Sequence, residues 1–116
     1  MPVRKAIADK DGVYFIIFTC TTWLPLFKIC NAYNTVYKWF NHLKEQGHHI
    51  IGYVFMPSQV HAIIAFANTD KSINTTISNG KRFIAYELIK RLKEKSSTLI
   101  LNESIIFIGI LAKEIN

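Results

Sequence analysis

Residues 49–66 read HIIGYVFMPSQVHAIIAF, which is two runs of aliphatic and aromatic residues on either side of Pro57-Ser58. Runs of this composition are typical of β-strands, and a two-residue break between them is typical of a hairpin. The sequence therefore predicts antiparallel strands over 49–56 and 59–66. The other elements can be placed outward from this hairpin.

The segments before the hairpin predict one more strand and one helix. Residues 13–20 (VYFIIFTC) follow the turn-forming pair Asp11-Gly12 and predict a largely buried strand. Residues 21–29 contain a proline and predict a loop or a short irregular piece. From 31 to 46 apolar residues recur at helical spacing ahead of Gly47, which predicts a helix that stops there.

The segments after the hairpin predict a longer helix and a strand-like tail. Ser72 is the predicted N-cap, Gly80 is a weak point inside the helix, and the helix fades at Ser96-Ser97. The apolar tail, residues 98–101 and 105–111, either completes the sheet or is exposed and prone to aggregation, and its pattern favours completion of the sheet. The buried stripe of the helix, with Phe83 beside it, is predicted from helical spacing: Ile73, Ile77, Ile84, Leu88 and Leu92.

The predicted order is strand, helix, strand, strand, helix and tail. This order is the opening of a ferredoxin-like α+β layer, an antiparallel sheet with two main helices packed on it. Because the sequence has no repeat, low-complexity stretch or linker, we expect a single domain over residues 1–116.

Composition narrows the class of protein. Of the 116 residues, 50% are hydrophobic and 19% are charged, which is enough apolar surface for a core. The formal net charge of +6 makes a polyanion a candidate partner. No window is apolar enough for a spanning helix and the N-terminal segment has no signal core, so we expect a cytoplasmic protein without a membrane partner. Cys20 and Cys30 predict two reduced thiols, not a disulfide framework or a metal cluster.

Gln59 and His61 are two residues apart on a predicted strand, so both side chains lie on one face. An imidazole and an amide oxygen at that spacing can converge on a divalent ion such as Mg²⁺ or Mn²⁺. A single histidine on a strand is, however, more often structural than a metal ligand. His48 is predicted to lie on the same face as His61 but too far along the strand to share an ion, and His48 and His49 are predicted to be solvated.

The hairpin and its surroundings resemble a known family. The segment GYVFMPSQVHAII, residues 52–64, is similar to the region around M-P-N-H-V-H in single-tyrosine transposases of the HUH superfamily, in the branch of the REP-associated tyrosine transposases and their insertion-sequence relatives. Three further segments match: the first strand, DGVYFI followed by Phe18-Thr19, the helix start Ser72-Ile73, and the basic helix GKRFIAYE. The resemblance covers about residues 10–95, and residues 96–116 form an atypical apolar tail.

The resemblance implies a specific chemistry. The family cleaves and joins single-stranded DNA through a covalent 5′-phosphotyrosine link, and a tyrosine on a later helix is the nucleophile. Two histidines around an apolar residue hold a divalent metal that polarises the scissile phosphate. No nucleotide cofactor is implied, because the phosphotyrosine conserves the bond energy. A homodimer is expected, because relatives are typically dimers.

The sequence departs from the family pattern in two places. The family's H-V-H reads Gln59-Val60-His61 here, so His61 carries over as a metal ligand, Gln59 is a poorer one, and we expect Mg²⁺ or Mn²⁺ to bind weakly. The family's nucleophile lies in a late helix, whereas no tyrosine follows Tyr86 in this sequence, which ends at Asn116. A truncated or degenerate member of the family would explain both departures.

Tyr86 is the candidate for a substitute nucleophile. Arg82 and Lys90 lie one turn to either side of it, so the three side chains share a helix face on which a tyrosine could meet a phosphate. The alternative, which we favour, is a half-exposed tyrosine that stacks on a base or has no part in catalysis. The remaining tyrosines fit core or sheet positions better: Tyr14, Tyr33, Tyr37 and Tyr53.

The same helix carries most of the net charge of the chain. Residues 81–95 hold a net charge of +4, out of +6 in total. Such a helix is either a solvated face or a surface for the DNA backbone. The candidate DNA-binding residues are Lys81, Arg82, Lys90, Arg91 and Lys93.

The leading hypothesis is a transposase-family protein that binds single-stranded or hairpin DNA and is catalytically impaired. The first alternative is an active single-strand nuclease or transposase that uses Tyr86 or the tyrosine of a partner subunit. The second alternative is a non-enzymatic module that dimerises through the apolar tail.

Overall fold

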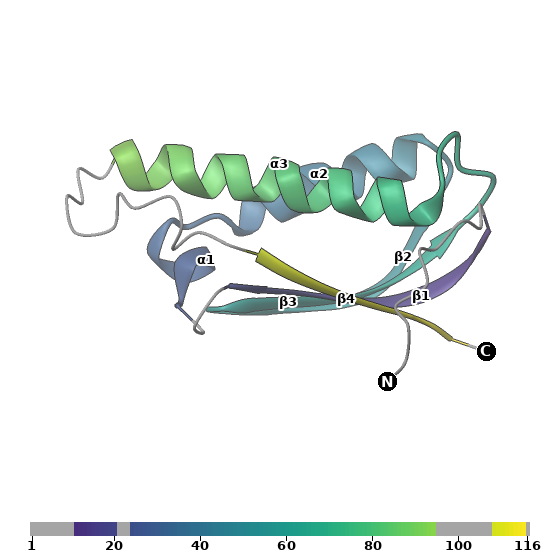
Figure 1. Ribbon diagram of the computed structural model, residues 1–116, viewed down its shortest axis with the longest axis horizontal. Helices are drawn as coiled ribbons and strands as arrows, with labels where there is room; N and C mark the ends of the chain where they lie inside the picture. Colours follow the sequence, from purple (N-terminus) through teal and green to yellow (C-terminus); the bar gives the residue numbers. More distant parts are fainter. Residues whose placement is uncertain (1–10, 21–23, 95–107, 116) are drawn as a thin grey trace.

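The structure of the chain is a computed structural model that describes residues 11–20, 24–94 and 108–115 (Figure 1). No helix among these residues combines the length and the apolar character needed to cross a bilayer. The predicted order of elements is confirmed, with one added turn of helix in the segment predicted as a loop or irregular piece. The elements are β1 (Gly12–Cys20), α1 (Leu26–Ile29), α2 (Tyr33–Glu45), β2 (His49–Met56), β3 (Gln59–Phe66), α3 (Ile73–Glu94) and β4 (Ile108–Glu114).

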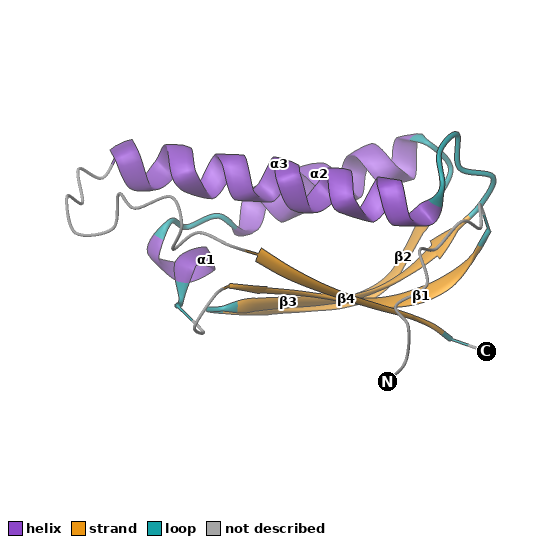
Figure 2. Cartoon of the chain, in the orientation of Figure 1, coloured by secondary structure: helices purple, strands orange, loops and turns teal. Residues whose placement is uncertain are grey.

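The strands form one antiparallel sheet in the order β2-β3-β1-β4. β1 and β3 are the central strands, and β2 and β3 form the predicted hairpin, with Met56 opposite Gln59 at the turn. α2 and α3 lie on the same side of this sheet, and α1 sits at one end of it (Figures 1 and 2). The predicted ferredoxin-like α+β fold is therefore confirmed.

Alternation along the central strands gives the sheet two different faces. Every second residue of β1 and β3 is buried beneath the helices, and we call this side the covered face. The residues between them, such as Phe15 in β1 and His61 in β3, point to the other side and are only partly buried, and we call that side the open face. The covered face consists of Tyr14, Ile16, Phe18 and Cys20 of β1 and Val60, Ala62, Ile64 and Phe66 of β3.

The C-terminal tail completes the sheet, as the pattern favoured. β4 pairs with β1 from Tyr14 opposite Glu114 to Cys20 opposite Ile108. β1 thereby has a neighbour on both sides, so its main-chain hydrogen-bonding groups are not left as an exposed edge. The strand-like residues 98–101 of the prediction lie outside the described residues.

The packing of α3 on α2 depends on a glycine. α3 begins at the predicted N-cap, where the Ser72 hydroxyl accepts a hydrogen bond from the Thr75 N–H at 3.2 Å. The five residues of the predicted stripe are buried, but Phe83 is 42% exposed. Gly80, predicted to be a weak point, is instead a buried contact with α2, because a Cβ there would lie 2.7 Å from Trp39 Nε1. The missing side chain lets the two helices approach.

The tyrosines lie only partly where the sequence placed them. Tyr14 is buried and Tyr33 packs against the core, whereas Tyr37 and Tyr53 are 42% and 46% exposed. The hydroxyls of Tyr37 and Tyr53 are 3.2 Å apart, and this hydrogen bond raises the pKa of Tyr37. Both rings pack on Phe55, at centroid distances of 5.0 and 5.1 Å. They form an aromatic cluster between α2 and the edge strand β2 at the rim of the core.

The cysteines are buried thiols. Cys20 and Cys30 form no disulfide, in agreement with the prediction of reduced thiols. Burial raises the pKa of Cys20 to about 11, so its sulfur stays protonated near neutral pH and is a poor nucleophile.

Candidate functional site

Gln59 and His61 stand together at the start of β3 on the open face. His61 Nε2 and Gln59 Oε1 are 2.6 Å apart, a hydrogen bond in which the imidazole N–H donates to the amide oxygen. The His61 ring also packs edge-on against Phe15 of β1, with the ring centroids 5.7 Å apart. The structure thus brings the two side chains to one point.

The hairpin turn before this pair is held by main-chain hydrogen bonds. The Pro57 carbonyl accepts from the Phe27 and Lys28 N–H groups at 3.1 and 3.4 Å. The Ser58 carbonyl accepts from the Cys20 N–H at 2.9 Å. The turn is therefore tied both to α1 and to the end of β1, and the single turn of α1 fixes the start of the strand that carries the pair.

The Gln59–His61 pair falls short of a metal centre. Among the described residues, no group of three or more His, Cys, Asp and Glu side chains could hold a metal ion. Mg²⁺ and related hard ions are usually bound through carboxylates together with several waters. An ion here would also have to replace the hydrogen bond that joins the two donor atoms. The residues present do not fit a complete divalent-ion site, so no reaction step follows from one.

The structure does not bring Tyr86 to this pair. Tyr86 lies on α3, above the covered face, and its side chain is 64% exposed. The sheet therefore stands between the Tyr86 hydroxyl and His61 of the same subunit. The five tyrosines of the sequence are all described, and each belongs to the covered face or to the helices above it: Tyr14 in β1, Tyr53 in β2, Tyr33 and Tyr37 in α2, and Tyr86 in α3.

Arg91, predicted as a DNA contact, is engaged within the chain. Its guanidinium donates to the Asn31 carbonyl at 2.6 Å and to the Cys30 carbonyl at 3.4 Å. It also forms an ion pair with Glu87, one turn earlier on α3, at 3.4 Å. These contacts fix the turn between α1 and α2, where Asn31 has a positive φ of 49°. Arg91 therefore holds the fold together at this point.

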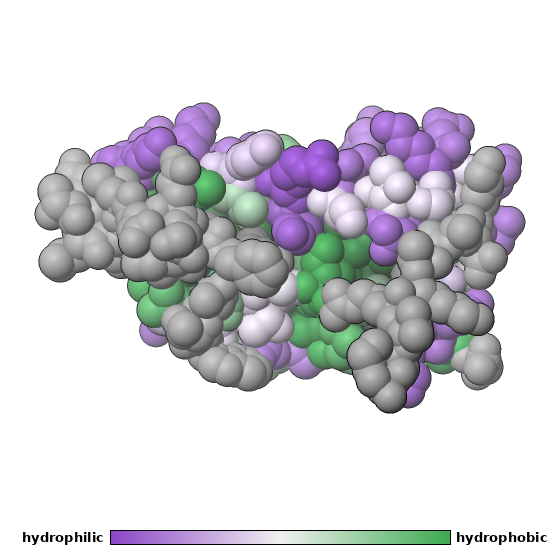
Figure 3. All heavy atoms as spheres, in the orientation of Figure 1, coloured by the Kyte–Doolittle hydropathy of each residue, from purple (hydrophilic) through white to green (hydrophobic). Residues whose placement is uncertain are grey.

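Arg82, Tyr86 and Lys90 form an exposed row along the outer side of α3. They are four residues apart, so their side chains share one helix face. Neither Arg82 nor Lys90 makes an ion pair with another described residue. Lys81 and Lys93, also predicted to bind DNA, have interactions inside the chain. We call Arg82, Tyr86 and Lys90 the α3 stripe. Figure 3 shows hydrophilic residues gathered along the helix layer and hydrophobic residues at the surface below it.

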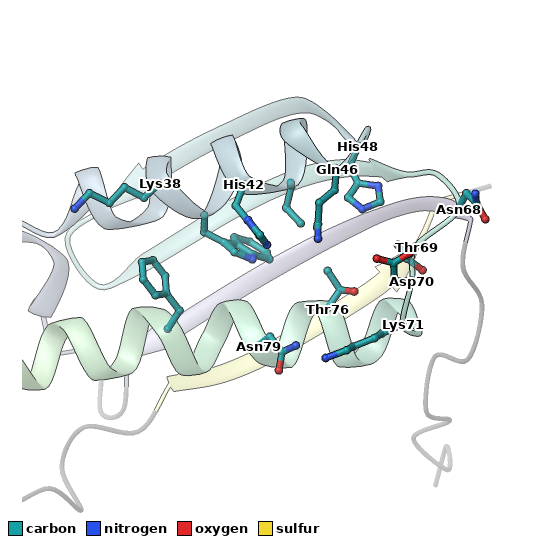
Figure 4. A pocket seen from close by; sticks show the side chains of 13 residues that line it. Lys38, His42, Gln46, His48, Asn68, Thr69, Asp70, Lys71, Thr76 and Asn79 are labelled. Atoms are coloured by element: carbon teal, nitrogen blue, oxygen red, sulfur yellow. The ribbon is translucent and has the colours of Figure 1, made fainter.

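A cleft between α2 and α3 was not predicted from the sequence. Its volume is about 530 Å³. Four segments line it: α2, the residue before β2, the loop after β3, and the first half of α3 (Figure 4). No local pattern links these segments, because they meet only when both helices pack on the sheet. The lining residues are Lys38, Trp39, His42, Leu43, Gln46, His48, Asn68, Thr69, Asp70, Lys71, Thr76, Asn79 and Phe83.

His48 is buried in the wall of this cleft, so the prediction of a solvated histidine is wrong. It is 3% exposed, its Nδ1 accepts a hydrogen bond from the Ala67 N–H at 3.1 Å, and its ring packs on Phe66 at a centroid distance of 5.3 Å. The predicted common face with His61 is also wrong, because a β-bulge in β2 reverses the alternation. His48 thus lies with the covered face and His61 with the open face.

Acid is expected to destabilise the protein through His48. Burial lowers the pKa of His48 below its usual 6.5. The negative charge of Asp70 acts in the opposite direction and offsets only part of this lowering. The unfolded chain then takes up a proton more readily than the folded chain. Stability is therefore fully present above the usual pKa and is lost as the pH falls below it, by at most about 1.4 kcal/mol per pH unit. Urea unfolding at about pH 5 and about pH 7.5 measures this loss.

Two adjacent substitutions provide the controls. His48→Asn keeps an acceptor near the Ala67 N–H and removes the titrating group, so its stability should vary less between the two pH values. His49→Asn changes the exposed neighbour and should retain the pH dependence of the unmodified protein. An unaltered pH dependence in His48→Asn would show that another group is responsible.

Comparison with solved structures identifies the fold. A REP-associated tyrosine transposase, solved bound to a REP hairpin, matches 100% of this chain and 63% of its own, with a TM-score of 0.63 and 13% sequence identity. A candidate transposase from Deinococcus radiodurans R1 matches 100% of this chain and 87% of its own, with a TM-score of 0.61 and 11% identity. The chain thus spans less than two thirds of the REP-associated transposase. No protein-family profile and no curated protein sequence matches it. The chain therefore has a tyrosine-transposase fold, which confirms the family resemblance at the level of the fold.

Proposed function

We propose that this chain is a transposase-family protein that binds single-stranded or hairpin DNA through α3. The observation that carries the proposal is the α3 stripe, in which exposed Arg82 and Lys90 flank an exposed Tyr86. The two cations neutralise backbone phosphates, and the tyrosine ring between them offers a stacking surface for an unpaired base. The similar REP-associated transposase was solved bound to a REP hairpin, which supports a hairpin as the form of DNA.

We also propose that strand cleavage is impaired in this chain. A phosphotyrosine mechanism needs a hydroxyl and an electrophilic group at the same phosphate. Here the open face carries Gln59 and His61 without a tyrosine, and Tyr86 lies on the far side of the sheet. A Mg²⁺ or Mn²⁺ ion is expected to bind weakly at this pair, because two donors already bonded to each other hold an ion poorly.

The competing function is strand cleavage by Tyr86 on DNA held at the open face of a second subunit. It requires a homodimer in which α3 of one subunit reaches the other's open face. Large apolar side chains exposed on β2 and β4 favour association with a second copy: Ile51, Val54 and Leu111 are 58%, 57% and 54% exposed. Association through these side chains would equally stabilise a homodimer without enzymatic activity.

The test is binding and cross-linking of a labelled DNA hairpin with a 5′ single-stranded tail. We expect a salt-sensitive shift in native electrophoresis, and no covalent protein–DNA band in denaturing electrophoresis with Mn²⁺ present. A blunt duplex of the same length should bind more weakly, because its bases cannot stack on Tyr86.

Each result that differs from the expected one favours one of the competing functions. A covalent band that disappears in Tyr86→Phe would overturn the impairment and establish cleavage by Tyr86. No shift at low salt would overturn DNA binding and leave a structural dimer. Light scattering of the same sample tests the dimer, and a monomer at all concentrations would exclude Tyr86 acting on a second subunit.

A further inference from the structure

The cleft between α2 and α3 has the lining of a binding site that the α3 stripe does not use. Its rim on the α2 side has a polar residue at every fourth position: Lys38 and His42 of α2, and Gln46 at the C-cap of that helix. The side chains of His42 and Gln46 point toward α3 in Figure 4. The opposite wall, from α3, includes Asn79 and Phe83. The cleft therefore presents donors, acceptors and an aromatic ring to one space.

His48 is a fixed part of the wall of this space. It is 3% exposed and lines the cleft. Because its Nδ1 accepts from the Ala67 N–H, the neutral ring carries its proton on Nε2. The ring is therefore held in one orientation in the wall of the cleft.

The loop that closes the cleft is already fixed in place. The Asn68 N–H donates to Asp11 Oδ1 at 2.7 Å, and Asn68 has a positive φ of 50°. Together with the Ala67 N–H bond to His48, this bond holds the start of the loop that leads into Asp70 and Lys71. A cleft built on pinned backbone loses little entropy when it binds a ligand.

Cations stand at the two ends of the cleft. Lys38 lies at one end and Lys71 at the other, next to the start of α3 (Figure 4). Neither lysine makes an ion pair with another described residue, and Asp70 is the one acidic side chain in the lining. The 42% exposed ring of Phe83 is the apolar surface on the α3 wall. Two cations and an exposed aromatic ring in one cleft match a base with a phosphate on either side.

We propose that this cleft holds one unpaired nucleotide of a DNA strand, with the base against Phe83 and the flanking phosphates toward Lys38 and Lys71. The volume of about 530 Å³ lies within the range of small-ligand sites, about 300–1,000 Å³. The inference rests on the proposed function and extends it from the α3 stripe to a subsite for a single nucleotide. A free nucleoside phosphate shares this chemistry, and the experiment separates the two sources.

The experiment is calorimetric titration of the full chain with three probes: thymidine 3′,5′-bisphosphate, thymidine 5′-monophosphate and inorganic phosphate. We expect the bisphosphate to bind most tightly, and excess tailed hairpin DNA to displace it. Phe83→Ala should weaken binding of the bisphosphate by about tenfold, the scale of a single base–aromatic stacking interaction. Lys71→Gln should weaken it by about five- to tenfold near 0.1 M salt, the scale of one phosphate contact. Both positions are exposed, so both variants should fold. Lys44→Gln removes an exposed lysine of α2 outside the cleft and should bind normally.

The remaining outcomes overturn the inference in distinguishable ways. Binding of inorganic phosphate as tight as the bisphosphate, unaffected by Phe83→Ala, would reveal an adventitious ion only. A monophosphate that binds as well as the bisphosphate, and that hairpin DNA does not displace, would make the occupant a free nucleotide. Hairpin binding without any bisphosphate binding would refute the cleft and leave the α3 stripe standing. Bisphosphate binding without hairpin binding would refute the proposed function.

Discussion

Replacing Gly80 by valine is expected to lower the free energy of unfolding by about 3 kcal/mol or more. A Cβ at this position would lie 2.7 Å from Trp39 Nε1 and closer still to two carbons of the indole. Trp39 has little room to move, because it is 5% exposed and packs on Phe18 and Phe40 at centroid distances of 5.5 and 5.8 Å. The helices must therefore separate, and the core between them loses its close packing.

Urea unfolding measures this effect, and alanine gives the sharper comparison. In a helix interior, alanine usually stabilises by about 1 kcal/mol relative to glycine. Gly80→Ala should instead destabilise, because its one added carbon already meets Trp39. Gly52→Ala is the matched control, since nothing lies within 4 Å of the carbon it would add. A Gly80→Ala variant more stable than the unmodified protein would contradict the close approach of the two helices.

Local patterns were sufficient for the elements and the fold. The β-branched and aromatic run at 13–20 and the apolar run at 59–66 predicted two strands, and the structure confirms them as β1 and β3. The apolar run at 105–111 indicated a sheet strand, and β4 (Ile108–Glu114) is found beside β1. Ser72 marked the start of α3 through its capping chemistry. Such signals are contained within a few residues of sequence.

Features that depend on tertiary packing could not be predicted in this way. The bulge in β2 moves His48 to the covered face, and its one local signal is Gly52 inside the strand, which does not fix the register. Helix propensity predicted Gly80 to be a weak point, whereas its role is to let Trp39 of another helix pack closely. Positive charge predicted Arg91 to bind DNA, whereas its guanidinium is held by the Asn31 carbonyl. The cleft has the same origin, since its walls come from four separate segments.

Reversing two charges on the α3 stripe is expected to weaken hairpin binding by about 25- to 60-fold near 0.1 M salt. The double variant is Arg82→Glu with Lys90→Glu, which removes both exposed cations beside Tyr86. Each phosphate that a cation neutralises adds about 0.7 to 0.9 to the slope of log K against log salt, so the double variant should reduce the slope by about 1.4 to 1.8. Fluorescence anisotropy of a labelled hairpin over a range of salt concentrations gives both quantities.

The control must separate a local contact from the general effect of charge, because the chain carries a net charge of +6 that attracts any polyanion. Lys28→Glu with Lys44→Glu changes the net charge equally, at exposed positions on α1 and α2. If phosphates contact the α3 stripe, this control lowers affinity only slightly and leaves the salt slope unchanged. Equal losses in the two double variants would mean that DNA is attracted by the overall charge, and that α3 is not the interface.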